Sequence, residues 1–194
     1  MVFRDKSRTY ETDVQFSKRE PDGDDIKRDI CDTCGFINYE NPKIVAGIVA
    51  TWDRKILMCR RNIEPRKGFW TLPAGFMEQR ETTQQAAARE AQEEANADIE
   101  VGELLGIYNI SRISQVQIFY RGKLRSPHIS AGVESMEVAL FDWEDIPWDE
   151  LAFPSVYWAL QYYKETRALH YFPPAKEPDD WFQTPGFEKL TGEA

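Results

Sequence analysis

The segment that most constrains the fold is Thr82–Ala95, which is rich in alanine and glutamate. Thr82 with Gln85 three residues later forms a capping box, so the segment predicts a helix that begins here. Asn96 suits the left-handed position that follows a helix end. The alanines have high helix propensity and leave a narrow face, which suits close packing against a sheet. The sequence therefore predicts a layered domain in which this helix covers a sheet.

Three glutamates on the same helix share one face. Glu90, Glu93 and Glu94 stand at positions i, i+3 and i+4, where like charges destabilise an isolated helix. A solvated acidic face is the simplest interpretation of such a pattern. Arg89 beside the cluster and the glycine-containing loop Leu72–Gly75 before it favour a site instead, because a glycine backbone can approach a ligand closely. Grouped carboxylates beside exposed carbonyls form an all-oxygen site of the kind that Mg²⁺ or Mn²⁺ prefers.

The 194 residues divide into three zones. Residues 1–43 are polar and predict a small β arm, residues 44–169 form the main domain, and residues 170–194 are rich in proline and aromatic residues such as Trp181, Phe182 and Phe187. Strands interrupted by two helices predict an α/β sandwich with a mixed sheet. The strands are expected over 43–52, 55–61, 99–110, 115–123 and 136–141, and the second helix over 153–167.

Composition excludes several function classes. The chain has 24 basic and 33 acidic residues and a net charge of −9, which disfavours binding to nucleic acid or to an anionic membrane. Its longest apolar run, residues 44–52, is far short of the ~20 residues that a membrane span needs. No apolar stretch follows Met1, so we expect no secretory signal and a cytoplasmic location. A small phosphate-bearing substrate remains compatible, provided that metal ions or arginines screen the carboxylates.

The number and spacing of the cysteines predict that the chain does not hold a stoichiometric zinc ion by itself. Cys31 and Cys34 form a CxxC followed by glycine, a zinc-knuckle shape, whereas Cys59 lies in an apolar segment. Structural zinc needs four ligands, no Cys or His precedes Cys31, and both histidines lie far downstream. We expect a knuckle turn without stoichiometric zinc. A zinc ion shared between two copies of the chain is the alternative.

The segment from Gly75 to Ala97 resembles the Nudix box, Gly-x5-Glu-x7-Arg-Glu-U-x-Glu-Glu-x-Gly-U, where U is a bulky apolar residue. Gly75, Glu81 and the run that begins at Arg89 match every charged position, and Asn96 replaces the second glycine. The flanking segments Trp70–Gly75 and Glu134–Phe141 fit as well, and the resemblance covers about residues 36–169. It implies a Nudix-type α/β/α sandwich.

The resemblance also implies a hydrolase that cleaves a diphosphate linked to a further group. Family roles then fall on residues of this chain by position. Mg²⁺ or Mn²⁺ would be held by the Ala74 carbonyl and by Glu90, Glu93, Glu94 and Glu134. The residues that serve catalysis would be Glu93, Glu134 and Arg89. Gly75 and Glu81 would shape the box, with Glu81 paired to Arg89. Glu137 is the alternative to Glu134 as the carboxylate outside the box.

The layout of the knuckle before the domain resembles zinc-ribbon Nudix enzymes, among them NADH pyrophosphatases and a group that acts on FAD and ADP-ribose. The chain lacks the Ser-Gln-Pro-Trp-Pro-Phe-Pro signature of the NADH group, and the segment Gly132–Trp148 with Leu151–Phe153 looks more like the FAD and ADP-ribose group. This resemblance implies ADP-ribose or FAD as the substrate, with AMP released. Arg61 and Arg112 are candidate phosphate contacts and Tyr108 is a candidate stacking residue, with Arg60 and Phe119 as further candidates.

Three other functions are open at this point. They are hydrolysis of NADH or diadenosine polyphosphates, sanitation of oxidised nucleoside triphosphates, and ligand sensing without catalysis. Sensing domains usually lose box carboxylates and gain a basic helix-turn-helix segment, neither of which is seen in this sequence. The resemblance further implies a homodimer in which the N-terminal arms pack across the interface.

Overall fold

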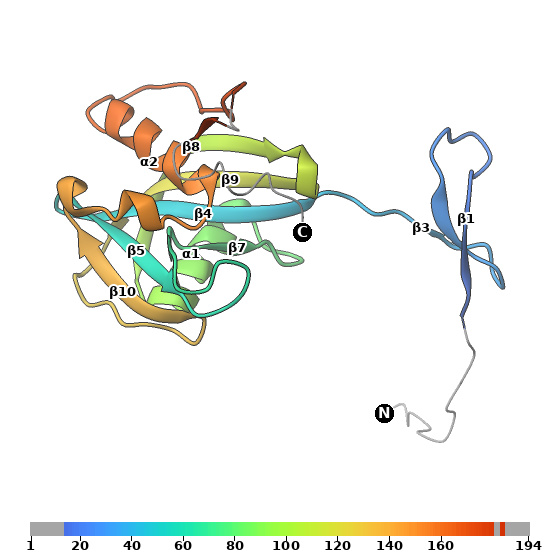
Figure 1. Ribbon diagram of the computed structural model, residues 1–194, viewed down its shortest axis with the longest axis horizontal. Coiled ribbons are helices and arrows are strands. Elements are labelled where there is room, and N and C mark those ends of the chain that lie inside the picture. The colour runs from blue at the N-terminus through green and yellow to red at the C-terminus, as the bar shows by residue number, and fades with distance from the viewer. Residues whose placement is uncertain (1–13, 181–182, 185–194) are drawn as a thin grey trace, which may run out of the picture. The chain divides into compact units, whose positions relative to one another are not determined.

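The computed structural model describes residues 14–180 and 183–184, which belong to two compact units, Met1–Asn41 and Pro42–Ala194 (Figure 1). The first residues of the expected arm and much of the aromatic tail, including Trp181, Phe182 and Phe187, lie outside the described residues. The boundary between the units in the chain follows Asn41, and the segment after residue 169 belongs to the same unit as the main domain.

The N-terminal unit contains a three-stranded antiparallel sheet in the order β1 (Phe16–Arg19), β2 (Arg28–Cys31) and β3 (Ile37–Asn38). The CxxC turn joins β2 to β3. In this turn the Gly35 amide donates to the Cys31 carbonyl at 2.9 Å, and Gly35 has a φ of 75°, a conformation that favours glycine. Cys31 is buried and Cys34 is exposed. The expected small β arm is confirmed.

The C-terminal unit is built on a seven-stranded sheet in the order β10-β5-β4-β9-β8, to which β6 and β7 add at β5 and β4. Among the strands of the described residues, β4 and β9 pair in parallel and the other pairs are antiparallel, so the sheet is mixed, as expected. Its strands are β4 (Lys43–Trp52), β5 (Lys55–Arg61), β6 (Trp70–Thr71), β7 (Ala74–Phe76), β8 (Ile99–Ile110), β9 (Gln115–Leu124) and β10 (Ser135–Phe141).

Side-chain alternation along the strands creates two separate cores. On β5, Leu57 and Cys59 face one cluster, whereas Ile56 and Met58 face the other. The first cluster contains the buried alanines of helix α1 (Thr83–Ala95), and the second contains the apolar residues of helix α2 (Pro154–Thr166). The two helices therefore cover opposite faces of the sheet (Figure 1), which confirms the predicted α/β/α sandwich.

Helix α1 has the predicted ends. The Thr82 hydroxyl accepts from the Gln85 amide at 3.2 Å, and the Gln85 side chain accepts from the Thr82 amide at 2.8 Å. Asn96 is left-handed, with φ 48° and ψ 35°, and its amide donates to the Gln92 carbonyl at 2.9 Å. These bonds satisfy backbone groups that a helix leaves free at its ends.

The chain after α2 returns to the sheet. The Ala175 amide donates to the Leu105 carbonyl at 2.9 Å, and the Ile107 amide donates to the Ala175 carbonyl at 2.8 Å, so this segment lies along β8. The remaining elements are three short 3₁₀ helices, η1 (Ser111–Ile113), η2 (Trp143–Asp145) and η3 (Trp148–Glu150). Among the described residues, no helix is long and apolar enough to cross a membrane.

Candidate active site

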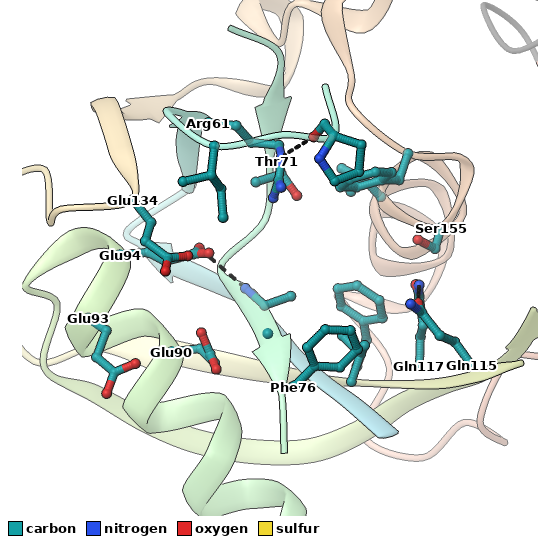
Figure 2. Close-up of a pocket in the computed structure, with 18 of the residues that line it drawn as sticks. Arg61, Thr71, Phe76, Glu90, Glu93, Glu94, Gln115, Gln117, Glu134 and Ser155 are labelled. Carbon is teal, nitrogen blue, oxygen red and sulfur yellow. Dashed lines mark hydrogen bonds between the residues drawn. The ribbon is translucent and has the colours of Figure 1, made fainter. Parts of the chain in front are cut away.

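A cavity of about 730 Å³ opens in the C-terminal unit between β7, α1, β9, the loop before β10 and the start of α2 (Figure 2). Its lining includes Arg61, Glu64 and Glu78 and, in addition, two sets of side chains that differ in chemistry. The first set, here called the carboxylate wall, consists of Glu90, Glu93, Glu94 and Glu134. The second set, here called the amide wall, consists of Phe76, Ile113, Gln115, Gln117, Phe119, Phe153, Ser155 and Val156.

Strand β7 brings its backbone directly against the carboxylate wall. It pairs with β4, opposite Ala46 and Gly47, and this pairing fixes Ala74 and Gly75 beside α1. A Cβ atom at Gly75 would overlap the carboxyl group of Glu90, so only glycine fits while Glu90 keeps this position. The Ala74 amide donates to the Glu94 carboxylate at 3.4 Å.

Arg89 ties the loop to the helix. Its Nε and one terminal nitrogen donate to both carboxylate oxygens of Glu81 at 3.0 and 2.8 Å, and the same terminal nitrogen donates to the Phe76 carbonyl at 3.0 Å. The other terminal nitrogen contacts Glu90 at 2.7 Å and Glu93 at 3.0 Å. The bonds from Arg89 hold the Glu81 pKa below its usual range. The bonds to Glu81 first, and then to Glu90 and Glu93, raise the pKa of Arg89.

Burial controls the charge of two glutamates. Glu94 is 6% exposed, and its burial raises its pKa from 4.5 to about 8; the nearby charges of Glu90 and Glu134 add to this, while the Ala74 amide and Arg61 oppose it. Burial also raises the pKa of Glu90, against the opposing effect of Arg89. A nearby cation lowers such pKa values, because it stabilises the charged form.

The loop before β10 places the fourth carboxylate. The Asn62 amide donates to the Glu134 carbonyl at 2.8 Å, and the Gly132 amide donates to the Glu94 carbonyl at 2.9 Å. Figure 2 shows the side chains of Glu134 and Glu94 directed toward the same part of the cavity. Glu137, the alternative, instead lies 3.5 Å from Arg60 and outside the cavity lining.

The donor chemistry of the carboxylate wall fits a hard divalent cation. Within residues 14–180 and 183–184, no three His, Cys, Asp or Glu side chains already converge as a ligand group. The fit rests on Glu94 instead, a buried carboxylate whose hydrogen bond from the Ala74 amide is long at 3.4 Å. Buried charge of this kind is expensive unless it is paired or coordinates a metal. Glu90 and Glu134 add oxygen donors nearby.

The amide wall has a different chemistry. Its ring and aliphatic side chains are apolar, and its polar groups are two amides and a hydroxyl. Gln117 Nε2 donates to Gln115 Oε1 at 3.0 Å, so the two amides form a pair. Figure 2 shows Phe76, Gln115, Gln117 and Ser155 on the side of the cavity opposite the glutamates.

The expected substrate contacts are distributed unevenly. Arg61 lines the cavity, with its guanidinium 5.0 Å from the Phe153 ring centre. Arg112 is exposed on η1, outside the cavity lining. Tyr108 requires a correction: it is fully buried and packs against Phe119 and Trp158, because its side chain points to the α2 core, so no surface of it is free to stack on a substrate.

Of the further candidates, Phe119 lines the cavity, whereas Arg60 is held away by the Gly68 carbonyl at 2.9 Å. Sequence reasoning missed most of the amide wall. The spacing of Gln115, Gln117 and Phe119 at every second residue could have indicated one shared strand face. Nothing in the sequence places Phe153 and Ser155 in the same wall, since they come from the start of a helix distant in the chain.

Comparison with known proteins gives a consistent result. A model of the NUDIX domain matches residues 41–164. The "ADP-ribose pyrophosphatase" of Methanocaldococcus jannaschii is 32% identical over 119 residues, which are 59% of this chain and 69% of that protein. The "Dihydroneopterin triphosphate diphosphatase" of Escherichia coli is 32% identical over 99 residues, which are 50% of this chain and 64% of that protein.

Solved structures extend the match to most of the chain. A NUDIX hydrolase from Nitrosomonas europaea superposes with a TM-score of 0.80 at 43% identity, covering 84% of this chain and 93% of that one. The family match over residues 41–164 contains the seven-stranded sheet and the cavity lining.

Proposed function

This chain belongs to the Nudix hydrolase family, and we propose that it hydrolyses the diphosphate of ADP-ribose or FAD and releases AMP. The coarser activity, hydrolysis of a nucleoside diphosphate derivative, follows from the family and from relatives of that class. The observation that supports the finer proposal is the division of one cavity into a carboxylate wall and an uncharged amide wall. A diphosphate suits the carboxylate wall through divalent cations, and an uncharged group attached to the diphosphate suits the amide wall.

We assign the metal ligands to Glu90, Glu93, Glu94 and the Ala74 carbonyl, with Mg²⁺ or Mn²⁺ as the ion. When bound, such an ion neutralises diphosphate charge and stabilises the leaving phosphate. Glu94 supports the assignment, because a buried carboxylate with a raised pKa gains most from a nearby cation.

Glu134 and Arg89 have different proposed roles. Glu134 lines the cavity beside Glu94 and is the carboxylate that accepts a proton from the attacking water. Arg89 is a positioning residue, since its donors are bonded to Glu81, Glu90, Glu93 and the Phe76 carbonyl. It keeps the glutamates of α1 beside β7.

A panel of ADP-ribose, FAD, NADH, diadenosine polyphosphates and nucleoside triphosphates, each with Mg²⁺, tests the proposal. With ADP-ribose, one water divides the diphosphate into AMP and ribose 5-phosphate, and neither orthophosphate nor pyrophosphate forms. The Escherichia coli relative that acts on a triphosphate makes triphosphates the competing class. Faster turnover of a triphosphate than of ADP-ribose and FAD, with pyrophosphate released, would overturn the proposal.

A further inference from the structure

The amide wall has a composition that selects one kind of chemical group. Its eight side chains contain no ionisable group, although the opposite wall has four carboxylates. Two cations lie beside its rings, since Arg61 is 5.0 Å from the Phe153 ring centre and Lys43 is 5.2 Å from the Phe76 ring centre. The surface that the wall itself presents consists of rings and uncharged polar groups, which suits an uncharged group.

The shape of this wall favours a flat ring. Phe76 is 50% exposed and lines the cavity, with Lys43 5.2 Å from its ring centre, and the rings of Phe119 and Phe153 also line the space. Stacking between an aromatic side chain and a base is worth about 1–3 kcal/mol. A sugar offers no comparable π-face.

The paired glutamines add a hydrogen-bonding edge. Because Gln117 Nε2 already donates to Gln115 Oε1, the pair retains the Gln117 side-chain carbonyl as an acceptor and the Gln115 amide NH2 group as a donor. Such an amide pattern matches a ring edge that presents a donor beside an acceptor, as nucleobases do. Both side chains are half-buried, so without a ligand their remaining donor and acceptor have few partners other than water.

Arg61 lies where the two walls meet. Figure 2 shows it above the cavity, between the labelled glutamates and the labelled glutamines. Its guanidinium is held by the Pro65 carbonyl at 2.9 Å and by the Phe153 ring. A positive charge at this place suits the phosphate that joins a base-bearing nucleoside to the group being cleaved.

From these observations we infer that the amide wall is the nucleobase subsite, with the Gln115–Gln117 pair reading the base edge and Phe76 stacking on its face. The inference rests on the proposed function and specifies which half of the substrate lies where. The nucleoside end of ADP-ribose occupies the amide wall, and the terminal ribose lies elsewhere.

Binding of the two products distinguishes the halves without turnover. AMP and ribose 5-phosphate are titrated by calorimetry, with Mg²⁺ present, into the wild type, Gln117→Leu and Gln117→Glu. We expect each variant to bind AMP about tenfold more weakly, the scale of losing a buried hydrogen bond, with ribose 5-phosphate unaffected. Gln161→Leu, on α2 and outside the cavity lining, is the matched control and should bind AMP like the wild type.

Two results would overturn the inference: AMP binding unchanged in both variants, or ribose 5-phosphate weakened as much as AMP. Gln117→Glu keeps the side-chain volume, and an unchanged melting temperature shows that either variant folds. Kinetics provide a second readout, since KM for ADP-ribose should rise about tenfold with kcat nearly constant. If the wild type hydrolyses neither ADP-ribose nor FAD, the proposed substrate is wrong, while the AMP titration still tests the subsite.

Discussion

Glu94 is the residue that best shows how local environment sets the chemistry of this protein. Its side chain is buried, its backbone donor lies 3.4 Å away, and its neighbours Glu90 and Glu134 carry the same charge. The burial and the two neighbouring charges oppose ionisation of Glu94, and only weak support comes from the long bond to the Ala74 amide, yet metal binding requires the ionised form. The ionised form of Glu94 therefore lowers the free energy of unfolding of the metal-free protein, whereas the activity requires this form.

Replacing a glutamate of the carboxylate wall should abolish most activity. We expect Glu93→Gln and Glu94→Gln each to lower kcat by about two orders of magnitude, the scale of losing one charge-stabilising group in an active site. Steady-state turnover of ADP-ribose at saturating Mg²⁺ measures this. Near-normal turnover in both variants would show that the site is assigned wrongly.

The raised pKa of Glu94 also predicts a pH dependence. The unfolded chain releases this proton near 4.5 and the metal-free folded chain near 8, so folding disfavours the charged form. The metal-free protein should therefore lose several kcal/mol of stability as pH rises across that window, at about 1.4 kcal/mol per pKa unit.

Urea unfolding in a chelator, at about pH 5 and about pH 9, measures this effect. The loss should be much smaller in Glu94→Gln, because glutamine does not titrate, and Mg²⁺ should restore stability to the wild type alone. An equal pH dependence in the two proteins would contradict the assignment.

At the scale of elements, α1 is stabilised from both ends by contacts with different origins. Its start is capped locally by Thr82 and Gln85, whereas its last turns are bonded by a distant loop, with the Ser130 amide donating to the Ala95 carbonyl at 2.9 Å. The local cap follows from neighbouring residues, and the loop contact follows from the fold. Through these bonds between the loop and the helix end, Glu134 is held close to the three glutamates of α1.

Removing the local cap should weaken folding without altering the chemistry. Thr82→Ala should lower the free energy of unfolding by about 1 kcal/mol, while Thr82→Ser should retain most of it, because serine also caps. Denaturant unfolding gives the comparison, and kcat should stay near the wild-type value in both. A large loss of kcat in a folded Thr82→Ala protein would show that the cap also positions the site.

The turn between β2 and β3 is a second element with a testable property. Hydrogen bonds from the backbone of Cys34 and Thr33 lower the pKa of the Cys31 thiol, although each chain supplies only two thiols here. We expect substoichiometric zinc in the purified protein and nearly full activity in the double variant Cys31→Ser, Cys34→Ser.

Elemental analysis that found one tightly held zinc per chain would disprove this expectation. Half a zinc per chain would instead indicate a four-thiolate site built by two copies. Chelation of Mg²⁺, in contrast, should stop the reaction in both the variant and the wild type.

At the scale of the whole molecule, the N-terminal unit is small for the apolar surface it carries. Its described residues form a sheet of three short strands, and five large apolar side chains on it are about half exposed: Val14, Phe16, Ile26, Phe36 and Tyr39. A sheet of this size has little core of its own. Such surface is typical of a face that another chain covers.

We therefore predict a C2 homodimer that involves the N-terminal unit. Light scattering at micromolar concentration should give twice the chain mass of 22.6 kDa. Phe36→Ser and Tyr39→Ser together should shift the protein toward monomer, whereas Tyr171→Ser, at an exposed residue of the other unit, should not. A monomeric wild type would contradict the prediction.

The sequence alone determined the features that depend on near neighbours. The bounds of β4 and β5, both ends of α1, the left-handed Asn96 and the shared face of Glu90, Glu93 and Glu94 follow from periodicity, capping and turn chemistry, which act over a few residues. The arm and the mixed sheet also follow, since they depend on the alternation of strands and helices.

Tertiary structure alone decided which faces meet. Tyr108 lies on β8, where alternation fixes that neighbouring side chains point in opposite directions but not which direction is the core. The amide wall combines β9 with the start of α2, and the Glu94 pKa is raised by burial and by the charge of Glu134, which comes from a loop distant in the chain. These contacts join residues distant in the chain, and their energies depend on packing and desolvation, which exist only once the sheet and its two helices have assembled.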